Sequence, residues 1–179
     1  MNFPRIYSLS TVGILKHYVH DYLFHPLRTD FIGPNGVGKS IIADLLQILF
    51  VFDRSRIQFG TDGVNPRYLA KIPYKDFAYC FIVVEVLPGQ FLVLGTAIDE
   101  RKNGKLLPFV ITAGSNLEGK LEELTIPATD IPVATSFLKG GIIPELEPLA
   151  RHLLDSKKLL LIRNYAGSVN SLRRMSRFI

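Results

Sequence analysis

The strongest periodic pattern in the sequence lies between residues 39 and 52, a stretch without proline or glycine. Its apolar residues recur at helical spacing and then continue without a break, at Ile41, Ile42, Leu45, Leu46, Leu49, Phe50, Val51 and Phe52. Because apolar positions occupy so much of the helical circumference, the pattern predicts a helix that is buried on most sides.

Runs that predict β-strands precede this helix. Residues 5–14 alternate loosely between apolar and polar side chains, and residues 18–24 form a second run that His25 and Pro26 bring to an end. Residues 29–32 (Thr-Asp-Phe-Ile) predict a short third strand that leads directly into a glycine-rich turn. We therefore expect a strand, a turn and a buried helix in immediate succession.

Further apolar runs follow a loop-like stretch at residues 53–67. A Pro-Gly-Gln turn separates the first two and an Asn-Gly turn precedes the third, so they predict antiparallel strands at residues 77–87, 91–98 and 106–112. Beyond residue 113 glycines and prolines weaken the pattern, which still indicates a helix at 144–154 and a short strand or helix at 159–162.

The composition indicates a single lobe built on one core. The chain has 179 residues, 47% of them hydrophobic, which is enough for one core of ordinary size and too few for two. Within this lobe we expect residues 1–60 to form the core around the glycine-rich turn, residues 75–112 to form antiparallel strands, and the undefined residues 113–179 to lead toward a coiled coil. Cys80 is the only cysteine, which excludes an intrachain disulfide and a thiolate metal cage.

Charge and hydropathy favour a cytoplasmic protein that does not span a membrane. Lys and Arg outnumber Asp and Glu by 21 to 16, an excess that permits an anionic partner without requiring one. The most apolar candidate span, residues 80–98, is interrupted by Glu85 and by the Pro-Gly-Gln turn. The N-terminal segment lacks the unbroken apolar stretch and the cleavage site of a signal peptide.

The glycine-rich turn carries the most specific chemical signal. It matches the P-loop pattern at every fixed position, with the residues Gly33, Pro34, Asn35, Gly36, Val37, Gly38, Lys39 and Ser40. Glycines let the backbone bring its N–H groups onto phosphate oxygens, and the start of the helix adds partial positive charge. Lys39 supplies a mobile charge to the β- and γ-phosphates, and Ser40 a hydroxyl ligand for Mg²⁺. The alternative is a glycine-rich turn with an incidental Lys-Ser pair, which the flanking strand and helix predictions make improbable.

With asparagine in its third position, this P-loop resembles that of ABC-type ATPases. The residues that follow it, from Ile41 to Phe50, and its position near the N-terminus resemble the SMC, RecF and RecN branch. Within that branch the sequence is similar to SMC-like proteins of the MukB type and of bacterial plasmid- or phage-defence systems. The resemblance is specific over residues 1–60, suggestive to residue 112 and absent beyond.

The resemblance implies an α/β fold, a P-loop NTPase head lobe with an additional antiparallel β-subdomain, as an incomplete half of an ABC-type head. It implies ATP and Mg²⁺ as cofactors, Lys39 as the catalytic residue, and nucleotide contacts that extend to Ile41. In that family ATP joins two heads and hydrolysis parts them to move DNA. We therefore expect a second ATPase head, from a homodimer or from a C-terminal half of the same protein, together with DNA and accessory subunits as partners.

Two elements of an ABC-type head are missing from the sequence. The signature motif is absent, since residues 138–141 (Leu-Lys-Gly-Gly) contain its glycine pair without its serine. No apolar strand ends in the acidic pair of a Walker B motif, because residues 81–85 end in Glu85 alone and residues 159–162 lead into Arg163. We therefore expect the chain by itself to hydrolyse ATP negligibly.

Several arginines are candidates for contact with DNA. Arg54 and Arg56 follow the P-loop helix, where SMC-like heads carry an arginine that can approach DNA or nucleotide, but solvated loop charges are an equal alternative. Arg173, Arg174 and Arg177 form a basic end that either meets DNA phosphates or is the polar face of a helix that begins a coiled coil.

Other polar residues carry weaker signals. His17, His20 and His25 are near one another, but no carboxylate or thiolate completes a metal-ligand set, so ordinary surface or core histidines are favoured. Gln58 and Gln90 are poor candidates for a Mg²⁺-sensing glutamine, since one follows the helix too closely and the other lies in a turn.

Three functions are compatible with these features. The first is an ATP-binding lobe of an SMC-like ATPase that acts on DNA. The second is a stand-alone P-loop kinase or GTPase, which is disfavoured because no Asn-Lys-x-Asp motif and no arginine-rich lid are recognisable. The third is a module that binds nucleotide and a protein partner without turnover.

Overall fold

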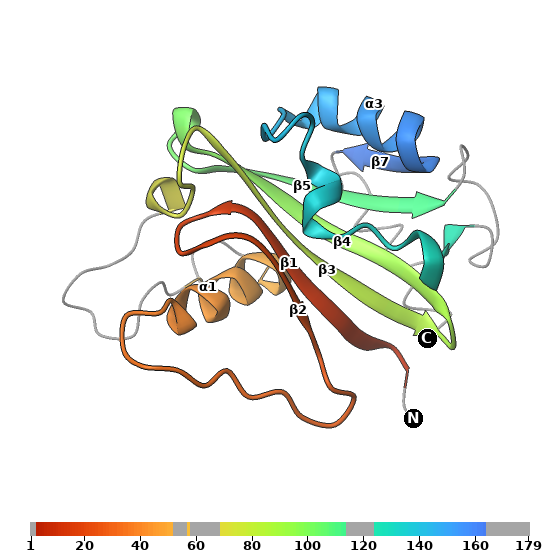
Figure 1. Cartoon of the computed structure of the whole chain (residues 1–179), viewed down its shortest axis with the longest axis horizontal. Helices are drawn as coiled ribbons and strands as arrows, with labels where there is room; N and C mark the ends of the chain where they lie inside the picture. The colour runs from red at the N-terminus through yellow and green to blue at the C-terminus, as the bar shows by residue number, and fades with distance from the viewer. Residues whose placement is uncertain (1–2, 52–56, 58–68, 114–123, 164–179) are drawn as a thin grey trace.

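One antiparallel sheet forms the centre of the molecule, as the computed structural model describes it for residues 3–51, 57, 69–113 and 124–163 (Figure 1). Within these residues the strand order is β2-β1-β3-β4-β5-β7, and β6 pairs with β4. The strands are β1 (Arg5–Ile14), β2 (His17–Leu23), β3 (Phe77–Leu87), β4 (Gln90–Asp99), β5 (Lys105–Ala113), β6 (Ile126–Pro127) and β7 (Leu159–Arg163). The predicted α/β class is confirmed, as are the N-terminal strands and the three antiparallel strands after residue 77.

The N-terminal hairpin and the later strands belong to the same sheet because β1 pairs with β3. Leu9 lies opposite Ile82 in this pairing, and Arg5 lies opposite Glu85 at one end of β1. At the other end of β1, Ile14 lies opposite His17 of β2. Glu85 of β3 and His17 of β2 therefore lie beside opposite ends of β1.

One face of the sheet packs on α3 (Leu146–Lys157) and on the 3₁₀ helix η5 (Ala134–Phe137). Alternate residues of β3, from Phe77 to Val83, point to this side because successive strand side chains face opposite ways. The Phe137 ring stacks on Phe81 with ring centroids 4.3 Å apart. We call this side the α3 face.

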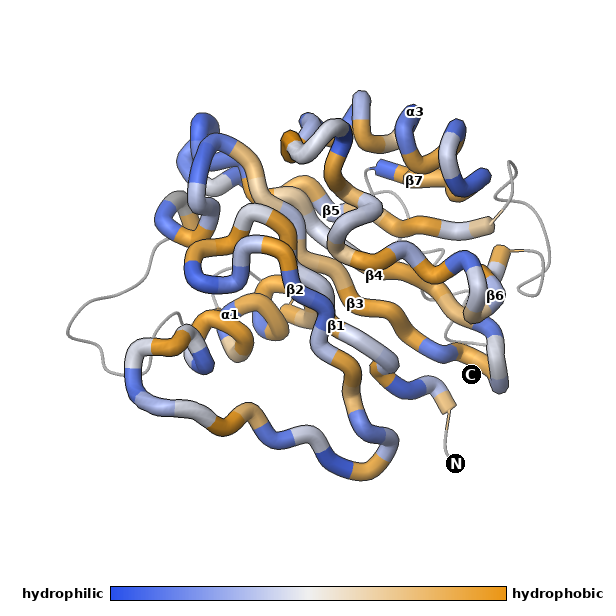
Figure 2. Tube along the Cα trace, viewed as in Figure 1, coloured by the Kyte–Doolittle hydropathy of each residue, from blue (hydrophilic) through white to orange (hydrophobic). Residues whose placement is uncertain are grey.

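The opposite side, the α1 face, is covered by α1 (Lys39–Phe50). Ile41, Leu45 and Ile48 of the helix pack there against Ala78 and Cys80 of β3. Figure 2 shows that both α1 and β3 are largely hydrophobic. Burial raises the pKa of the Cys80 thiol to about 12, as suits an inert core residue. The helix is buried on most sides, as predicted, but it ends at Phe50 because Val51 has extended backbone angles.

The predicted strand at residues 29–32 is wrong. The structure assigns these residues no strand or helix, and among the described residues they have no strand partner. An isolated extended segment is not stable as a strand, because its backbone groups need a neighbour to pair with. Ile32 at the end of this segment and Leu27 before it are correspondingly open to solvent, with 94% and 91% of their surface exposed. The P-loop segment thus follows an unpaired connection rather than a sheet strand.

The C-terminal part of the described chain is a helix followed by a strand. α3 begins at Leu146, two residues after the predicted start, and Lys158 ends it with a left-handed backbone. β7 then pairs with β5, which resolves the strand-or-helix alternative for this segment. The remaining short helices are η2 (Leu69–Lys71), η3 (Glu100–Lys102) and η4 (Ala128–Asp130). Among the described residues, no helix combines the length and the apolar character that crossing a bilayer requires.

Candidate phosphate-binding site

The P-loop segment has the backbone shape that its glycines predict at the start of α1. Gly36 and Gly38 have positive φ angles of 86° and 100°, values that side chains with a Cβ rarely adopt. Gly38 is the N-cap of α1, and its carbonyl oxygen accepts the N–H of Ile41 at 2.9 Å. The first N–H groups of a helix have no acceptor within the helix, so this end of α1 suits an anion.

Lys39 places its charge over the beginning of the loop. Its Nζ donates hydrogen bonds to the carbonyl oxygen of Gly33 and, at 2.8 Å, to that of Pro34. An ammonium group has three N–H donors, and these carbonyl groups accept two of them. The charge therefore lies at the mouth of the loop, from where a small rotation of a flexible side chain reaches an incoming phosphate.

The turn between β1 and β2 lies against the same loop. Lys16 has a left-handed backbone in this turn, and its Nζ donates to the carbonyl oxygen of Gly36. Next to it, the buried ring of His17 places Nε2 3.0 Å from the carbonyl oxygen of Gly38. Neither residue was among the sequence-based candidates for this site. The sequence carries no signal for them, because the contact joins segments that are about twenty residues apart.

His17 is an electrically neutral member of the site. Burial lowers the pKa of its imidazole, the hydrogen bond with Gly38 opposes that effect, and the nearby His20 and Lys16 lower the pKa further. At His25, by comparison, Nδ1 of the ring accepts the N–H of Leu27 at 3.2 Å. His17 instead contacts the candidate site.

A pocket of about 420 Å³ opens beside the loop. Its polar lining residues include Lys39, Thr29, Asp21 and Asp30, while Val37, Ile42, Tyr22 and Phe31 form apolar walls. Asp21 Oδ1 accepts hydrogen bonds from Ser10 Oγ and, at 2.9 Å, from Ala134 N–H, and Asp30 pairs with Arg28. Because Ala134 belongs to η5 on the α3 face, the Asp21 carboxylate is directed away from the P-loop. Neither acidic residue was predicted from the sequence, although Asp30 lies only three residues before the P-loop.

The remaining residues of the motif occupy the first turn of α1. Ser40 follows Lys39 and is half-buried, whereas the Ile41 side chain is buried against the sheet. Among the described residues, no group of three or more His, Cys, Asp and Glu side chains could hold a metal ion. A serine hydroxyl fits the chemistry of Mg²⁺, which takes one or two protein oxygens and fills its other positions with phosphate oxygens and water.

Glu85 lies far from the loop. Arg5 Nε donates to Glu85 Oε2 at 2.6 Å and Gly89 N–H donates to Oε1 at 2.9 Å, so both carboxylate oxygens are held at the β3–β4 turn. Alternation along β3 also directs this side chain toward the α3 face. The structure therefore does not bring Glu85 together with Lys39, in agreement with its interpretation as a hairpin residue.

The arginine and glutamine candidates contribute nothing to the described site. Arg54, Arg56, Gln58, Arg173, Arg174 and Arg177 lie outside the residues that the structure describes. Gln90 begins β4, directly after the β3–β4 turn that holds Glu85.

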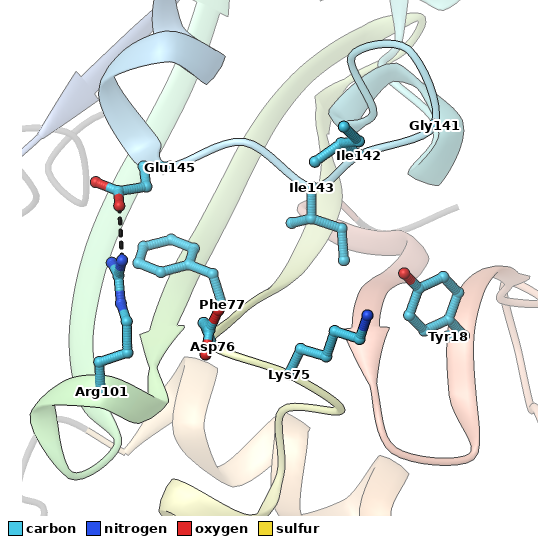
Figure 3. Close-up of a pocket in the computed structure, with 9 residues that line it drawn as sticks. All are labelled: Tyr18, Lys75, Asp76, Phe77, Arg101, Gly141, Ile142, Ile143 and Glu145. Carbon is cyan, nitrogen blue, oxygen red and sulfur yellow. Dashed lines mark hydrogen bonds and ion pairs between the residues drawn. The ribbon is translucent and has the colours of Figure 1, made fainter.

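A second pocket, of about 320 Å³, lies toward the α3 face (Figure 3). Lys75 extends there between Tyr18 and Ile143, and Arg101 Nη1 donates to Glu145 Oε1 at 2.8 Å. Arg101 also donates through Nε to Asp99 at 3.2 Å, so its charge is already paired. Lys75 is therefore the exposed cation of the second pocket, whereas Lys39 at the first pocket is held by the backbone carbonyls of the P-loop.

No family model matches this chain, and no curated protein or solved structure matches it significantly.

Proposed function

We propose that this chain is the ATP-binding N-terminal lobe of an SMC-like ATPase that acts on DNA, with residues 33–40 as the site for the ATP phosphates. One observation carries the proposal: a complete P-loop motif that precedes a buried helix and has left-handed backbones at Gly36 and Gly38. A short turn in this conformation exposes consecutive N–H groups on its concave side, which is the arrangement that phosphate oxygens require.

Charge at the loop supports the same proposal. The N-terminal end of α1 and the ammonium groups of Lys39 and Lys16 contribute positive charge to one small region. Their hydrogen bonds to loop carbonyls can be exchanged for stronger, charge-assisted bonds to phosphate oxygens. Mg²⁺, when bound with the nucleotide, would neutralise phosphate charge, and Ser40 is the residue that would hold it.

The second head that this proposal requires would cover the apolar side chains around the loop. Leu23 and Ile32, which line the pocket together with Lys39, are 69% and 94% exposed. Large apolar side chains grouped beside a polar site are typical of a surface that another polypeptide covers. We propose that this other polypeptide, from a second copy or from a C-terminal half of the same protein, also supplies the carboxylate for hydrolysis.

A nucleotide-binding module without turnover is the alternative function. Glu85 is held at the far end of β3, which favours this alternative for the chain taken alone. A measurement of ATP hydrolysis by the purified chain distinguishes these functions from a stand-alone enzyme. The ATPase lobe without its second head and the binding module should both show negligible turnover, whereas a stand-alone enzyme should hydrolyse ATP. Robust turnover that Lys39→Ala abolishes would show that Asp30 or an undescribed residue acts as the catalytic carboxylate.

Replacement of Lys39 by alanine tests the phosphate site directly. The substitution removes a charge-assisted contact, so we expect the dissociation constant of ATP–Mg²⁺, measured by titration calorimetry, to rise at least about tenfold. Lys75→Ala is the matched control, since it removes an exposed lysine that lines the second pocket. Equal affinities for the wild type and for Lys39→Ala would refute the P-loop assignment.

The DNA part of the proposal depends on the basic end of the sequence. Contacts there would be to phosphates, so we expect weak binding that ignores base sequence and decreases steeply with salt. Charge reversal at Arg173, Arg174 and Arg177 should lower DNA affinity and flatten the salt dependence while ATP affinity stays the same. Unchanged DNA binding would instead favour these arginines as the polar face of a coiled-coil helix. In that case the triple variant should lose helical content or partner binding.

A further inference from the structure

His17, at the start of β2, contacts the P-loop from outside. It is 8% exposed, and its Nε2 lies 3.0 Å from the carbonyl oxygen of Gly38. A Cβ atom placed on Gly38 would lie 2.3 Å from the same nitrogen. The close approach therefore excludes every side chain at Gly38 that does not also displace the histidine.

The partners of the ring determine which nitrogen carries the proton. A carbonyl oxygen only accepts, so the hydrogen bond with Gly38 requires a proton on Nε2. The other nitrogen, Nδ1, then accepts the hydroxyl proton of Tyr22. The backbone of His17 is held as well, because Thr11 Oγ1 donates to its carbonyl oxygen at 2.7 Å. Ring, tautomer and backbone are thus each fixed by a neighbour.

The Gly38 carbonyl has a particular place in the loop. It accepts the N–H of Ile41 as well as the ring N–H, so it joins the start of α1 to the hairpin. The peptide between Gly38 and Lys39 is planar and trans, so its C=O and its N–H point in opposite directions. Whatever fixes the carbonyl toward His17 also directs the Lys39 N–H away from His17.

We propose that His17 is a positioning residue of the phosphate-binding loop, which aims the Lys39 N–H at a bound phosphate by holding the Gly38 carbonyl. This inference rests on the proposed function, because it assigns a partner to one N–H of that site. Tyr22 assists by keeping the proton of His17 on Nε2. The loop is thereby preorganised by the β1–β2 hairpin and needs less ordering when the phosphate binds.

Two replacements of His17 separate a hydrogen-bond donor from a merely space-filling residue. Glutamine can place its amide N–H near the position of Nε2, whereas leucine fills similar space without a donor. We expect the ATP–Mg²⁺ dissociation constant to rise about five- to tenfold in His17→Leu and to stay within about twofold in His17→Gln. His152→Gln, on α3 at the opposite face of the sheet, is the control and should bind as the wild type does.

Amide NMR of the nucleotide-free chain tests the same inference without ATP. The Lys39 N–H signal should shift in His17→Leu and return toward the wild-type position in His17→Gln. A ¹⁵N spectrum of the histidine ring should show the proton on Nε2 in the wild type and a mixture of tautomers in Tyr22→Phe. This variant keeps the ring of Tyr22 and therefore remains informative if His17→Leu does not fold.

The outcomes distinguish the two proposals from each other. If the wild type does not bind ATP but the Lys39 signal responds as expected, the proposed function fails and the role of His17 in shaping the loop stands. If the wild type binds ATP and His17→Leu binds equally well, or His17→Gln is as weak as His17→Leu, the positioning role is refuted. A proton on Nδ1 in the wild type would also refute it.

Discussion

On the α3 face, aromatic rings from the sheet and from η5 fill the core, whereas on the α1 face the segment before the helix leaves large apolar side chains in solvent. Phe137 is fully buried among Tyr79, Phe81 and Phe109, with ring centroids 4.3 to 6.1 Å away. By contrast, Ile32 and Leu27 are almost fully exposed and a pocket opens between β2 and α1. The α3 face is therefore the densely packed side of the sheet, and the α1 face is the side on which the P-loop is open to solvent.

The difference indicates that one side of the sheet stabilises the fold and the other side carries the candidate binding site. We call this the division between the faces. Dense aromatic packing contributes most to the free energy of unfolding because buried rings lose contact with water on both sides. A site for a charged ligand needs the opposite, since N–H groups and an ammonium must remain reachable. If this division is correct, a substitution on the α3 face should affect stability without affecting ATP affinity.

Removal of the Phe137 ring should have the largest effect on stability. We expect Phe137→Ala to lower the free energy of unfolding by about 3–5 kcal/mol, because it leaves a cavity against Phe81. Phe50→Ala is the control at the end of α1, where the ring is 48% exposed, and should cost about 1 kcal/mol. Urea unfolding measures both. A folded Phe137→Ala protein that has lost ATP affinity would contradict the division between the faces.

Two glycine substitutions test whether the open α1 face is nevertheless rigid at the loop. Gly38 and Gly141 both have positive φ, but only Gly38 has a side chain, that of His17, in the way of a Cβ. We expect Gly141→Ala to cost about 1 kcal/mol through backbone strain alone. Gly38→Ala should cost about 2–3 kcal/mol, since strain and the displacement of His17 add, and should weaken ATP binding at least about tenfold. Equal unfolding free energies for the two variants would show that His17 and the loop can move apart at little cost.

Local patterns predicted the elements that local contacts form. The helix at residues 39–50, the hairpins and the third antiparallel strand each follow from the spacing of apolar residues and from turn residues within the same segment. The P-loop motif also predicted the left-handed glycines, since its chemistry depends on a few consecutive residues. These elements could be predicted without knowing which distant segments lie beside them.

Contacts between distant segments account for what the sequence could not predict. Residues 29–32 have the composition of a strand, but a strand needs a neighbour to accept and donate its hydrogen bonds, and composition does not reveal whether one is there. In the same way, no pattern shows that the β1–β2 turn lies over the loop and brings His17 to Gly38. The hydrogen bond from Ala134 N–H to the Asp21 carboxylate likewise joins segments that are more than a hundred residues apart.

The smallest expected effect concerns an ion-pair cluster at the edge of the α3 face. Burial alone would raise the pKa of Asp99, which is 1% exposed, but Arg101 and Lys102 outweigh it and hold the pKa of this carboxyl below its usual value. A lowered pKa stabilises the folded state above the pKa of the unfolded chain, about 3.9 for aspartate, and this contribution is lost as the pH falls through the folded pKa.

Asp99→Asn should therefore cost about 1 kcal/mol at neutral pH, and the difference from the wild type should shrink as the pH is lowered below about 4. Arg101 also pairs with Glu145 at the start of α3, so the substitution tests how far charges add to the aromatic packing of this face. Asp130→Asn, at an exposed position, is the control. Urea unfolding across this pH range measures the difference, and a gap that stays constant with pH would show that the carboxylate charge at Asp99 does not stabilise the α3 face.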